Sequence, residues 1–421
     1  VFCGYDHMRN EGVITALLVD GENVDKLHAG QQGIIVLDHT PFYAESGGQV
    51  GDQGEINTAG AHFIVKDTRK QGKAFTHIGE CKDGTFEVGQ QVIAHVDEYN
   101  RQATALNHSA THLLHAALRN VLGEHVTQKG SLVDSQRLRF DFSHFEPVTA
   151  EQLREIERMV NQHIRVNHAV ETRLMPIEKA RQSGAMALFG EKYDDEVRVL
   201  SMGDFSIELC GGTHVGRTGD IGLLKITNET GIASGVRRIE AVTGEAALNY
   251  IEQSENRLNS ISELVKAKPE NIEEKTQQLV QRTRQLEKEL ESLKSKLASS
   301  AGSDLAASAT EIGSIKVLAA NLEGADVKSL RDTVDQLKNK LGSAAIILAT
   351  VEGEKITLIA GLTKDVTDKI RAGDLVSHVA AQVGGKGGGR PDMAQGGGSE
   401  PQKLTAALDS VTNWVASKLE N

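Results

Sequence analysis

Cysteine is scarce in this sequence. The 421 residues include three cysteines, Cys3, Cys81 and Cys210, so at least one thiol has no partner. A disulfide framework is therefore excluded as the main source of stability. In a reducing compartment a lone cysteine is a metal ligand, a nucleophile or an inert core thiol. We therefore expect a cytoplasmic protein.

Long hydrophobic runs and targeting signals are also missing. No stretch reaches the roughly 18 consecutive apolar residues of a membrane span, so no membrane partner is predicted. No basic segment followed by an apolar core opens the sequence, so no secretion signal is predicted. Because the first residue is Val1 rather than methionine, we expect the chain to be a fragment of a longer protein.

Positive charge is in deficit. The formal net charge is -12, from 46 Lys and Arg residues against 58 Asp and Glu residues. This balance argues against a non-specific nucleic-acid binder, although a local basic surface can still bind one particular RNA.

The length predicts more than one domain, because single hydrophobic cores rarely exceed about 250–300 residues. We predict an α+β multidomain protein with four successive parts. These are a small β-barrel (residues 1–98), an α+β domain (99–250), a long coiled-coil helix with a linker (251–303) and a small α/β domain (304–421).

The first two parts differ in their local patterns. Short apolar stretches such as 33–38, 61–66 and 88–97, punctuated by glycines, indicate a barrel. From Tyr99 to Leu122, apolar residues recur with a period of about 3.6 residues and predict a helix. Thr149 followed by Gln152 is a capping-box pattern that predicts a second helix. Strands are expected at 138–143, 196–200, 205–209, 221–226 and 236–243.

Apolar residues recur every seven positions beyond residue 250. They are Leu258, Val265, Ile272, Leu279, Leu286 and Leu293, and Leu290 and Leu297 supply part of a second seam. The pattern predicts a coiled coil that Pro269 interrupts. The alternative is a single amphipathic helix packed on a neighbouring domain. Residues 299–303 are predicted to be a linker, followed by strands at 315–320, 344–350 and 355–361 and helices at 330–341 and 403–419.

Two distant segments carry metal-ligand side chains. His108 and His112 are four residues apart in the predicted helix, so both imidazoles lie on one face. Cys210 and His214 flank a Gly-Gly-Thr sequence that permits a tight loop. Imidazole and thiolate suit a tetrahedral zinc ion, so we predict one zinc site, with His115 as the rival ligand. Four protein ligands usually mark a structural ion, so either one ligand gives way to water or other groups position the water.

The sequences around these ligands are similar to a known editing domain. His108-Ser-Ala-Thr-His112 and Cys210-Gly-Gly-Thr-His214 resemble the domain shared by alanyl- and threonyl-tRNA synthetases and freestanding alanyl-tRNA editing proteins. Residues 42–52, 231–241 and 384–398 resemble motifs of the alanyl branch, and the last is also found in DHH phosphoesterases. The chain therefore resembles the C-terminal half of a bacterial-type alanyl-tRNA synthetase, with its editing and C-terminal domains.

This resemblance implies hydrolysis of seryl and glycyl esters of alanine tRNA. A second, hydrolytic site is needed because a pocket for alanine excludes glycine poorly and serine only modestly. It implies one Zn²⁺ per chain, and a need for ATP only in the missing aminoacylation core. It also implies a homodimer or higher oligomer through the coiled coil and the C-terminal domain. The implied residues are His108, His112, Cys210 and His214 for the metal, Gln128 and Cys210 for catalysis, Gly47, Gly48, Gln49 and Arg237 for the substrate, and Lys386 and Arg390 for tRNA.

Two other functions are considered. The first is a non-catalytic module that binds tRNA and dimerises, with a structural zinc ion. The second is a zinc peptidase, which the sequence disfavours because Ser109 occupies the glutamate position of a His-Glu-x-x-His motif.

Overall fold

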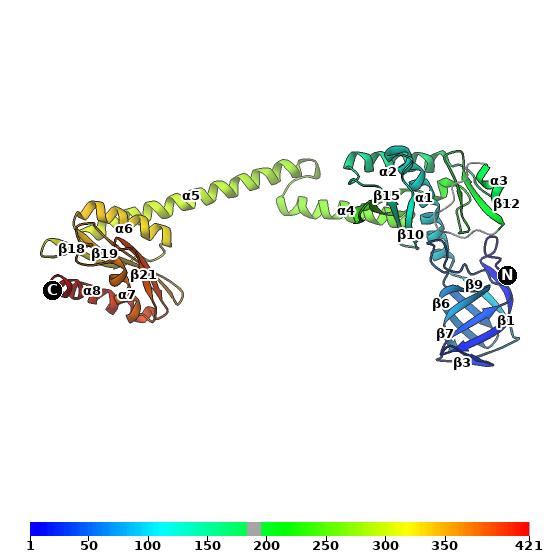
Figure 1. Cartoon of the computed structure of the whole chain (residues 1–421), viewed down its shortest axis with the longest axis horizontal. Helices are drawn as coiled ribbons and strands as arrows, with labels where there is room; N and C mark the ends of the chain where they lie inside the picture. Colours follow the sequence, from blue (N-terminus) through cyan, green and yellow to red (C-terminus); the bar gives the residue numbers. More distant parts are fainter. Residues whose placement is uncertain (183–194, 421) are drawn as a thin grey trace. The chain divides into compact units, whose positions relative to one another are not determined.

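The structure, a computed structural model, describes residues 1–182 and 195–420. The chain forms two compact units, Val1–Ser260 and Ile261–Asn421, each of which is described by itself (Figure 1). In the described part of the chain, no helix combines the length and the hydrophobicity that a membrane span requires.

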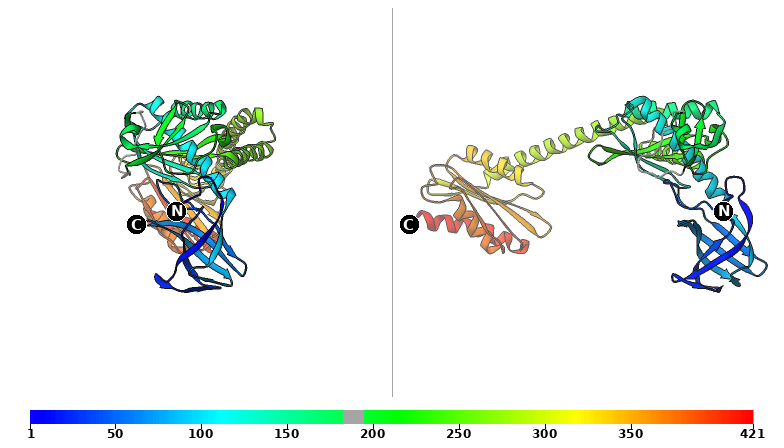
Figure 2. Two further views of the ribbon diagram at one scale, coloured as in Figure 1. Left: turned by 90° about the vertical axis from the view of Figure 1, so that its right-hand side faces the viewer. Right: turned by 45° about the vertical axis from the view of Figure 1, so that its right-hand side comes forward.

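The first unit begins with a closed barrel, as predicted. Six antiparallel strands follow one another around it, and the sixth pairs with the first (Figure 2). In spatial order they are β1 (Arg9–Val19), β4 (Gln32–Leu37), β7 (Ala74–Asp83), β6 (Ala61–Gln71), β5 (Gly54–Thr58) and β9 (Gln91–Val96). β2 (Glu22–Val24) pairs with β1, and β3 (Lys26–His28) pairs with β8 (Thr85–Glu87). Alternate residues, among them Leu17, Ile56 and Phe63, fill the interior.

Helix α1 (Glu98–Leu122) follows the barrel directly. The side chain of Asp97 caps its first turn, and Ala110, Leu113 and Leu114 pack on a four-stranded antiparallel sheet. The strands of that sheet, in order, are β10 (Gln128–Val133), β11 (Leu138–Ser143), β16 (Val236–Thr243) and β15 (Leu224–Ala233). Helix α2 (Ala150–Val166) packs beside α1 and begins with the predicted capping box of Thr149 and Gln152.

A second, smaller sheet completes the first unit. It comprises β12 (Val170–Pro176), β13 (Glu196–Met202) and β14 (Ser206–Leu209), and α3 (Ile177–Gln182) follows β12. The strand predicted at 221–226 begins only at Leu224. Residues Thr218–Ile221 form the short 3-10 helix η1, which ends at Gly222, where φ is +74°.

The heptad region forms two helices, α4 (Gly244–Val265) and α5 (Ile272–Ala307). The predicted interruption is present, because Pro269 opens the short 3-10 helix η2 (Pro269–Asn271) between them. The predicted linker at 299–303 is wrong, since α5 continues through it. Leu305 and Ala306 near its end pack against the core beneath α6 (Val327–Leu341), which outweighs the roughly 1 kcal/mol cost of a helical glycine at Gly302.

The second unit is built on a six-stranded mixed sheet. In spatial order its strands are β17 (Thr310–Ile312), β18 (Ile315–Asn321), β19 (Ala344–Glu352), β20 (Lys355–Leu362), β22 (Met393–Gly398) and β21 (Gly387–Gly389). β18 and β19 run parallel, whereas the other pairs are antiparallel. Helix α6 packs on one face, and α7 (Ala372–Gln382) and α8 (Leu404–Leu419), which follows η3 (Pro401–Lys403), pack on the other (Figure 1).

Candidate metal centre

Four predicted ligands come together inside the first unit. One ligand atom each from His108, His112, Cys210 and His214 lies within 4.8 Å of the other three. The Nε2 atoms of His108 and His214 lie 3.5 Å and 3.2 Å from the Cys210 Sγ atom. The two α1 histidines are on successive turns, and Cys210 begins the loop that follows β14, so a helix and a loop hold the ligands.

The donor set fits a zinc ion. Three imidazoles and one thiolate are ligand types of tetrahedral zinc sites. The Nε2 atom of His112 is buried and has no hydrogen-bond partner in the described residues, although buried polar atoms are normally paired. A bound cation would use that lone pair. The roles of these residues as zinc ligands stay predictions.

A carboxylate supports the ligand His112 from behind. Glu208 accepts hydrogen bonds from Nδ1 of His112 at 2.5 Å and from Nδ1 of His115 at 2.7 Å. This arrangement leaves Nε2 of His112 free to face the cluster, as in carboxylate–histidine–zinc sites. His115 itself is not part of the cluster, because it binds Glu208 and its ring lies against Phe140.

The electrostatics of the cluster favour a thiolate at Cys210. Burial alone would raise the pKa of this thiol, but the adjacent His108, His214 and His112 hold the pKa well below its usual value. Burial lowers the pKa of His214 to about 3, so that imidazole is neutral. A thiolate and a neutral imidazole are the protonation states that bind zinc.

The protonation of His112 depends on its two acidic neighbours. Burial lowers its pKa, but Glu208 and Cys210 raise it to about 10. Burial likewise raises the pKa of Glu208, whereas His112 and His115 bring it down to about 2. Without a cation, His112 therefore holds the proton that balances the two negative groups, and a bound cation would displace that proton.

Gly212 is required where it stands. A Cβ atom at this position would lie 2.1 Å from Cε1 of His108 and 2.8 Å from Oε1 of Gln49. The sequence predicted that the glycines permit a tight loop, and the structure adds a second role. Gly212 makes space for the ring of a ligand.

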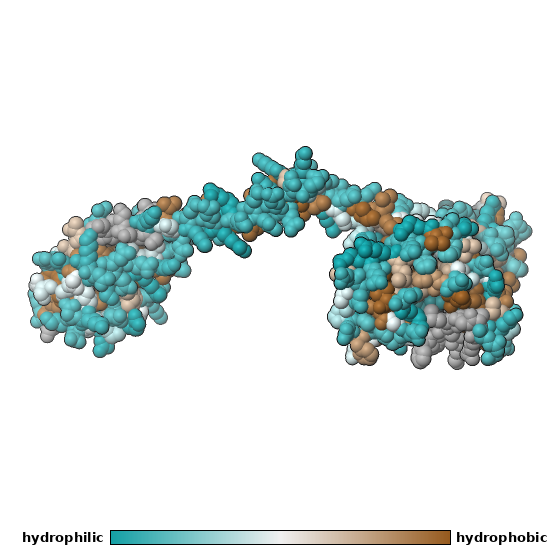
Figure 3. All heavy atoms as spheres, turned by 90° about the horizontal axis from the view of Figure 1, so that it is seen from above, coloured by the Kyte–Doolittle hydropathy of each residue, from teal (hydrophilic) through white to brown (hydrophobic). Residues whose placement is uncertain are grey.

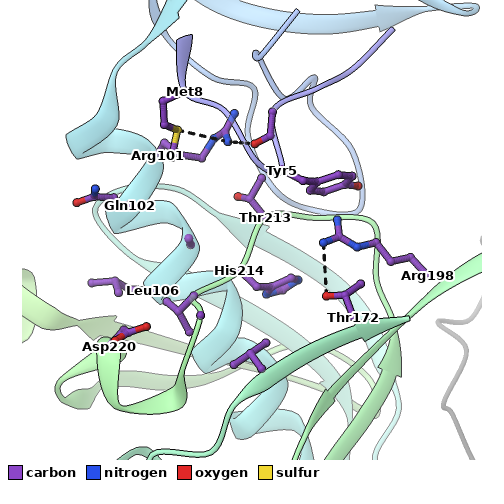
Figure 4. A pocket seen from close by; sticks show the side chains of 15 residues that line it. Tyr5, Met8, Arg101, Gln102, Leu106, Thr172, Arg198, Thr213, His214 and Asp220 are labelled. Atoms are coloured by element: carbon purple, nitrogen blue, oxygen red, sulfur yellow. Dashed lines mark hydrogen bonds between the residues drawn. The ribbon is translucent and has the colours of Figure 1, made fainter. Parts of the chain in front are cut away.

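A cavity of about 700 Å³ opens beside the cluster. His214 and Thr213 lie on one side of it, and Thr172 and Arg198 lie on another (Figure 4). The Arg198 guanidinium stacks 3.4 Å from the ring centroid of Tyr5, whose hydroxyl donates to the Gly211 carbonyl at 2.6 Å. The cavity therefore lies between the Cys210–His214 loop on one side and polar and aromatic side chains on the other.

Only some of the predicted substrate and catalytic residues lie near the cluster and the adjacent cavity. Gly47 and Gly48 form a turn that brings the buried Gln49 to His108, at 2.8 Å. Gln128 is half-buried at the start of β10 and is not among the residues that line the cavity beside His214. Arg237 is held by two hydrogen bonds, of 2.6 Å and 2.7 Å, to Glu229.

The predicted tRNA residues belong to the second unit. The glycine-rich segment 384–398 is neither a flexible linker nor an open loop, because β21 and β22 pair within it and extend the sheet from β20. Lys386 and Arg390 are exposed at the two ends of β21, and Arg390 lies 3.4 Å from Asp392.

Sequence reasoning missed Glu208 and Ser109 as supporting residues. Glu208 has a detectable signal, since it lies on β14 two residues before Cys210, and residues two apart in an extended segment point to the same side. Ser109 lies 3.1 Å from Nδ1 of His214 and accepts from the Val215 backbone at 3.2 Å. Nothing in the local sequence distinguishes Ser109, because its partners are more than 100 residues away.

Family models match three parts of the chain. The model of tRNA synthetases class II (A) matches residues 1–100, that of the threonyl and alanyl tRNA synthetase second additional domain matches residues 197–240, and the DHHA1 domain matches residues 314–417.

Curated relatives match almost the whole chain. The alanine–tRNA ligase of Saccharophagus degradans is 62% identical over 415 residues, which are 98% of this chain and 47% of the relative. That of Hydrogenovibrio crunogenus is 58% identical over 416 residues, 99% of this chain and 48% of the relative. A solved structure, the C-Ala domain from Aquifex aeolicus alanyl-tRNA synthetase, is 28% identical and covers 26% of this chain and 97% of that chain, with a TM-score of 0.25.

The chain spans about half the length of the curated relatives that it matches. The resemblance to the C-terminal half of a synthetase, which the sequence motifs indicated, is confirmed by these matches. The high identity over nearly all its residues shows that the chain belongs to the alanyl-tRNA synthetase family.

Proposed function

We propose that this chain hydrolyses the ester bond of mischarged alanine tRNA, with seryl- and glycyl-tRNA as substrates. The observation that carries the proposal is the His₃Cys cluster, in which the histidines of α1 are buried and Cys210 and His214 are half-buried, and which lies beside a cavity in a member of a tRNA ligase family. The match to the second additional domain of threonyl and alanyl synthetases includes Cys210 and His214, which supports the same assignment.

His108, His112, Cys210 and His214 would hold the metal ion, and Zn²⁺ suits this donor set. When bound, the ion would supply positive charge and fix the loop that borders the cavity. The four protein side chains fill the usual zinc coordination, so we assign the positioning of water to other groups. The resemblance implies Gln128 for this role, and since Gln128 does not line the cavity beside His214, the resemblance alone supports this assignment.

The cavity offers groups that discriminate a substrate hydroxyl. Thr172, Thr213 and Arg198 line it. The Thr213 hydroxyl accepts a hydrogen bond from Gln49 and keeps its own hydrogen for donation. A site built to hydrogen-bond a hydroxyl rejects the analogue that lacks it, because buried polar groups are then left unpaired. The serine side chain satisfies such groups, whereas that of alanine does not, so correctly charged tRNA is spared.

The reaction is a simple ester hydrolysis. Water adds to the ester carbonyl carbon, the bond between that carbon and the ribose oxygen breaks, and the ribose hydroxyl leaves with a proton. The free amino acid and intact tRNA are the products, and no ATP is consumed. The proposed hydrolysis therefore does not depend on the aminoacylation reaction.

Deacylation of defined substrates tests the proposal. The full chain is incubated with seryl-tRNA and alanyl-tRNA that carry the acceptor stem of alanine tRNA, and release of each amino acid is followed. We expect rapid loss of the seryl ester and little loss of the alanyl ester. We also expect a Gln128→Ala variant to retain its metal and to lose most of the seryl activity.

The same assay, with tRNA binding measured in parallel, decides between the hydrolase and the alternative function. A non-catalytic module would bind tRNA without releasing serine above the buffer rate. Retained tRNA binding with no release would exclude the hydrolase and leave a tRNA-binding module with a structural zinc ion.

We further propose that α5 pairs in parallel with α5 of a second copy of the chain. Leu279, Leu286, Leu290 and Leu293 are 43%, 47%, 56% and 57% exposed, so they are not packed within the described residues. On the face that Figure 3 displays, the helix is mainly hydrophilic with isolated hydrophobic residues. The side chain of Leu297, also predicted in the seam, lies outside the described residues.

Charge placement favours the parallel orientation. If Leu286 and Leu293 occupy d positions of the heptad, Arg282 and Glu289 occupy g positions, and Glu287 and Lys294 occupy e positions. In a parallel pair, a g residue of one helix lies beside the following e residue of the other, so Arg282 meets Glu287 and Glu289 meets Lys294. Sedimentation tests this pairing. We expect Leu286→Asp to dissociate the dimer and Gln281→Asp, on the outer face, to leave it intact. A monomeric wild-type chain at micromolar concentration would exclude the pairing.

A further inference from the structure

The barrel contributes a buried side chain to the metal centre. Gln49 is 0% exposed and follows a tight turn in which φ is +58° at Gly47 and +88° at Gly48. Backbone hydrogen bonds dock this turn on the end of β10, from Val50 to Val133 at 3.0 Å and from Val133 to Gly48 at 2.7 Å. A residue of the barrel part of the chain is therefore fixed beneath the ligands.

The hydrogen bonds of Gln49 determine its orientation. The Thr213 backbone N–H donates to one terminal atom of the Gln49 amide at 2.9 Å. Because a backbone N–H can only donate, that atom is the oxygen, Oε1. The other atom, Nε2, donates to the Thr213 hydroxyl at 2.8 Å. Both ends of the amide thus hold Thr213 in the Cys-Gly-Gly-Thr-His loop.

The same oxygen determines the tautomer of His108. Nδ1 of His108 lies 2.8 Å from Oε1 of Gln49. Since Oε1 has no hydrogen, Nδ1 must carry one and donate it. Nε2 of His108 is then unprotonated in the neutral ring, and this is the atom 3.5 Å from the Cys210 Sγ. Gln49 therefore presents the ligand lone pair of His108 to the cluster.

A second contact from the N-terminal segment holds the same loop. The Tyr5 hydroxyl donates to the Gly211 carbonyl at 2.6 Å, and the Arg198 guanidinium, stacked on Tyr5, lies 3.4 Å from the Gly212 carbonyl. Two side chains that precede α1, Tyr5 and Gln49, therefore bind the loop between Cys210 and His214, and Arg198 of β13 adds a third contact.

We propose that Gln49 is a positioning residue of the metal centre. It selects the metal-binding tautomer of His108 and fixes the Cys210–His214 loop, so the barrel is part of the site and not a separate module beside it. This inference rests on the proposed metal site, and it assigns Gln49 a role beneath the ligands instead of contact with the substrate.

Two substitutions of Gln49 test its positioning role. Gln49→Leu keeps the approximate volume and removes every hydrogen bond, so we expect metal affinity to fall about 10- to 100-fold, the usual effect of removing such a support. Gln49→Glu keeps the oxygen that accepts from His108 and Thr213 and adds negative charge near the cation. We expect it to bind metal at least as tightly as the wild-type chain.

The matched control is Gln53→Leu. Gln53 is exposed on the same barrel, so the identical substitution there should leave metal affinity unchanged. Far-ultraviolet circular dichroism of each metal-depleted variant shows that it is folded.

The experiment is a titration of the metal-depleted full chain with Co²⁺ in competition with a chromophoric chelator. The visible spectrum reports the thiolate and imidazole ligands, independently of any activity. A wild-type chain that binds no Co²⁺ would reject the proposed metal site itself. A wild-type chain that binds one Co²⁺, with Gln49→Leu equal to it in affinity and spectrum, would reject only the role of Gln49. If Gln49→Leu does not fold, Gln49→Glu decides, because tenfold weaker binding by that variant would overturn the proposal.

Discussion

The two units of the chain differ sharply in their chemically active side chains. Of the 15 histidines, only His378 lies in the second unit, and all three cysteines lie in the first. The first unit buries such residues with partners, as Glu208 does with His112 and His115. In the second unit, the two predicted tRNA-binding residues, Lys386 and Arg390, are exposed. The difference teaches that chemistry requiring fixed protonation and desolvation is concentrated in one unit, whereas the other offers charge at its surface.

Glycine serves different purposes in the two units. Gly212 makes space for the ring of His108. In the second unit, a Cβ at Gly385 would lie 1.7 Å from the Gly397 carbonyl oxygen, so glycine there permits backbone to approach backbone. The same residue type thus supports a ligand in one place and a hairpin in the other.

The largest effect is expected from removing the thiolate. Cys210→Ala should reduce metal affinity by more than the roughly 100-fold seen for supporting residues, because a direct ligand is lost. Zinc content by mass spectrometry of the native protein provides the measurement, and Cys3→Ala, outside the cluster, serves as the control. Unchanged stoichiometry in Cys210→Ala would remove this residue from the ligand set.

Alanine substitutions compare the glycines of the two units directly. Gly212→Ala should weaken metal binding about 10- to 100-fold, since overpacking of this kind costs about 1–3 kcal/mol and displaces His108. Gly388→Ala should leave metal affinity unchanged, because Gly388 belongs to the second unit and nothing lies within 4 Å of its added Cβ. Chelator competition measures both variants. Equal metal affinities of the two variants would show that the ring of His108 can move aside without weakening metal binding.

Acid should destabilise the first unit more than the second. His77 is fully buried and its ring nitrogens contact the Ile35 carbonyl and the Thr40 hydroxyl, at 2.8 Å and 2.7 Å. Burial lowers its pKa from 6.5 to about 4. The unfolded state therefore binds a proton first as pH falls from about 6.5 to 4, and roughly 3 kcal/mol of stability is lost in that window.

Calorimetry and fluorescence distinguish the units in that experiment. The single tryptophan, Trp414, reports unfolding of the second unit, whereas calorimetry registers both. We expect His77→Gln to lose the share of the pH dependence between 6.5 and 4 that comes from His77, and to keep the share from His214, whose pKa burial lowers to about 3. A variant with an undiminished dependence would assign the effect to other groups.

The smallest effect is expected at the exposed cations. Lys386→Ala or Arg390→Ala should weaken tRNA binding a few-fold, because exposed charge interactions contribute about 0.2–1 kcal/mol each. Metal content should not change. Filter binding at two salt concentrations measures the effect, and a loss that does not depend on salt would contradict a phosphate contact.

Local patterns predicted most elements of the fold. Capping by Thr149 and Gln152 and the interruption at Pro269 depend on neighbours in sequence, so they could be read directly. The predictions failed where contacts with residues distant in the sequence determine the local structure. Residues 299–303 have the composition of a linker, but the packing of Leu305 and Ala306 extends α5 through them. The glycine-rich hairpin exists because β22 pairs with β20, more than 30 residues earlier.

The candidate site shows the same limit. The spacing of His108 and His112 on a helix and of Cys210 and His214 around a glycine pair was sufficient to group them. The function of Gln49 was not accessible, because its contacts with His108 and Thr213 span 59 and 164 residues. Supporting residues come from whichever surface the fold brings beneath the ligands, and no local spacing encodes that.

The glycine hairpin also affects how the protein behaves in concentrated solution. β21 is the outermost strand of its sheet and consists of Gly387, Gly388 and Gly389, so it has no side chains of its own to shield its backbone groups, although the Ser377 hydroxyl donates to the Gly387 carbonyl. An unshielded edge of this kind is a template on which another chain can add a strand and begin to aggregate. The strand is only three residues long, and Lys386 and Arg390 stand at its ends. Short length and flanking charge are the means by which native sheets discourage such growth, so these two cations protect the solubility of the edge whether or not RNA is bound.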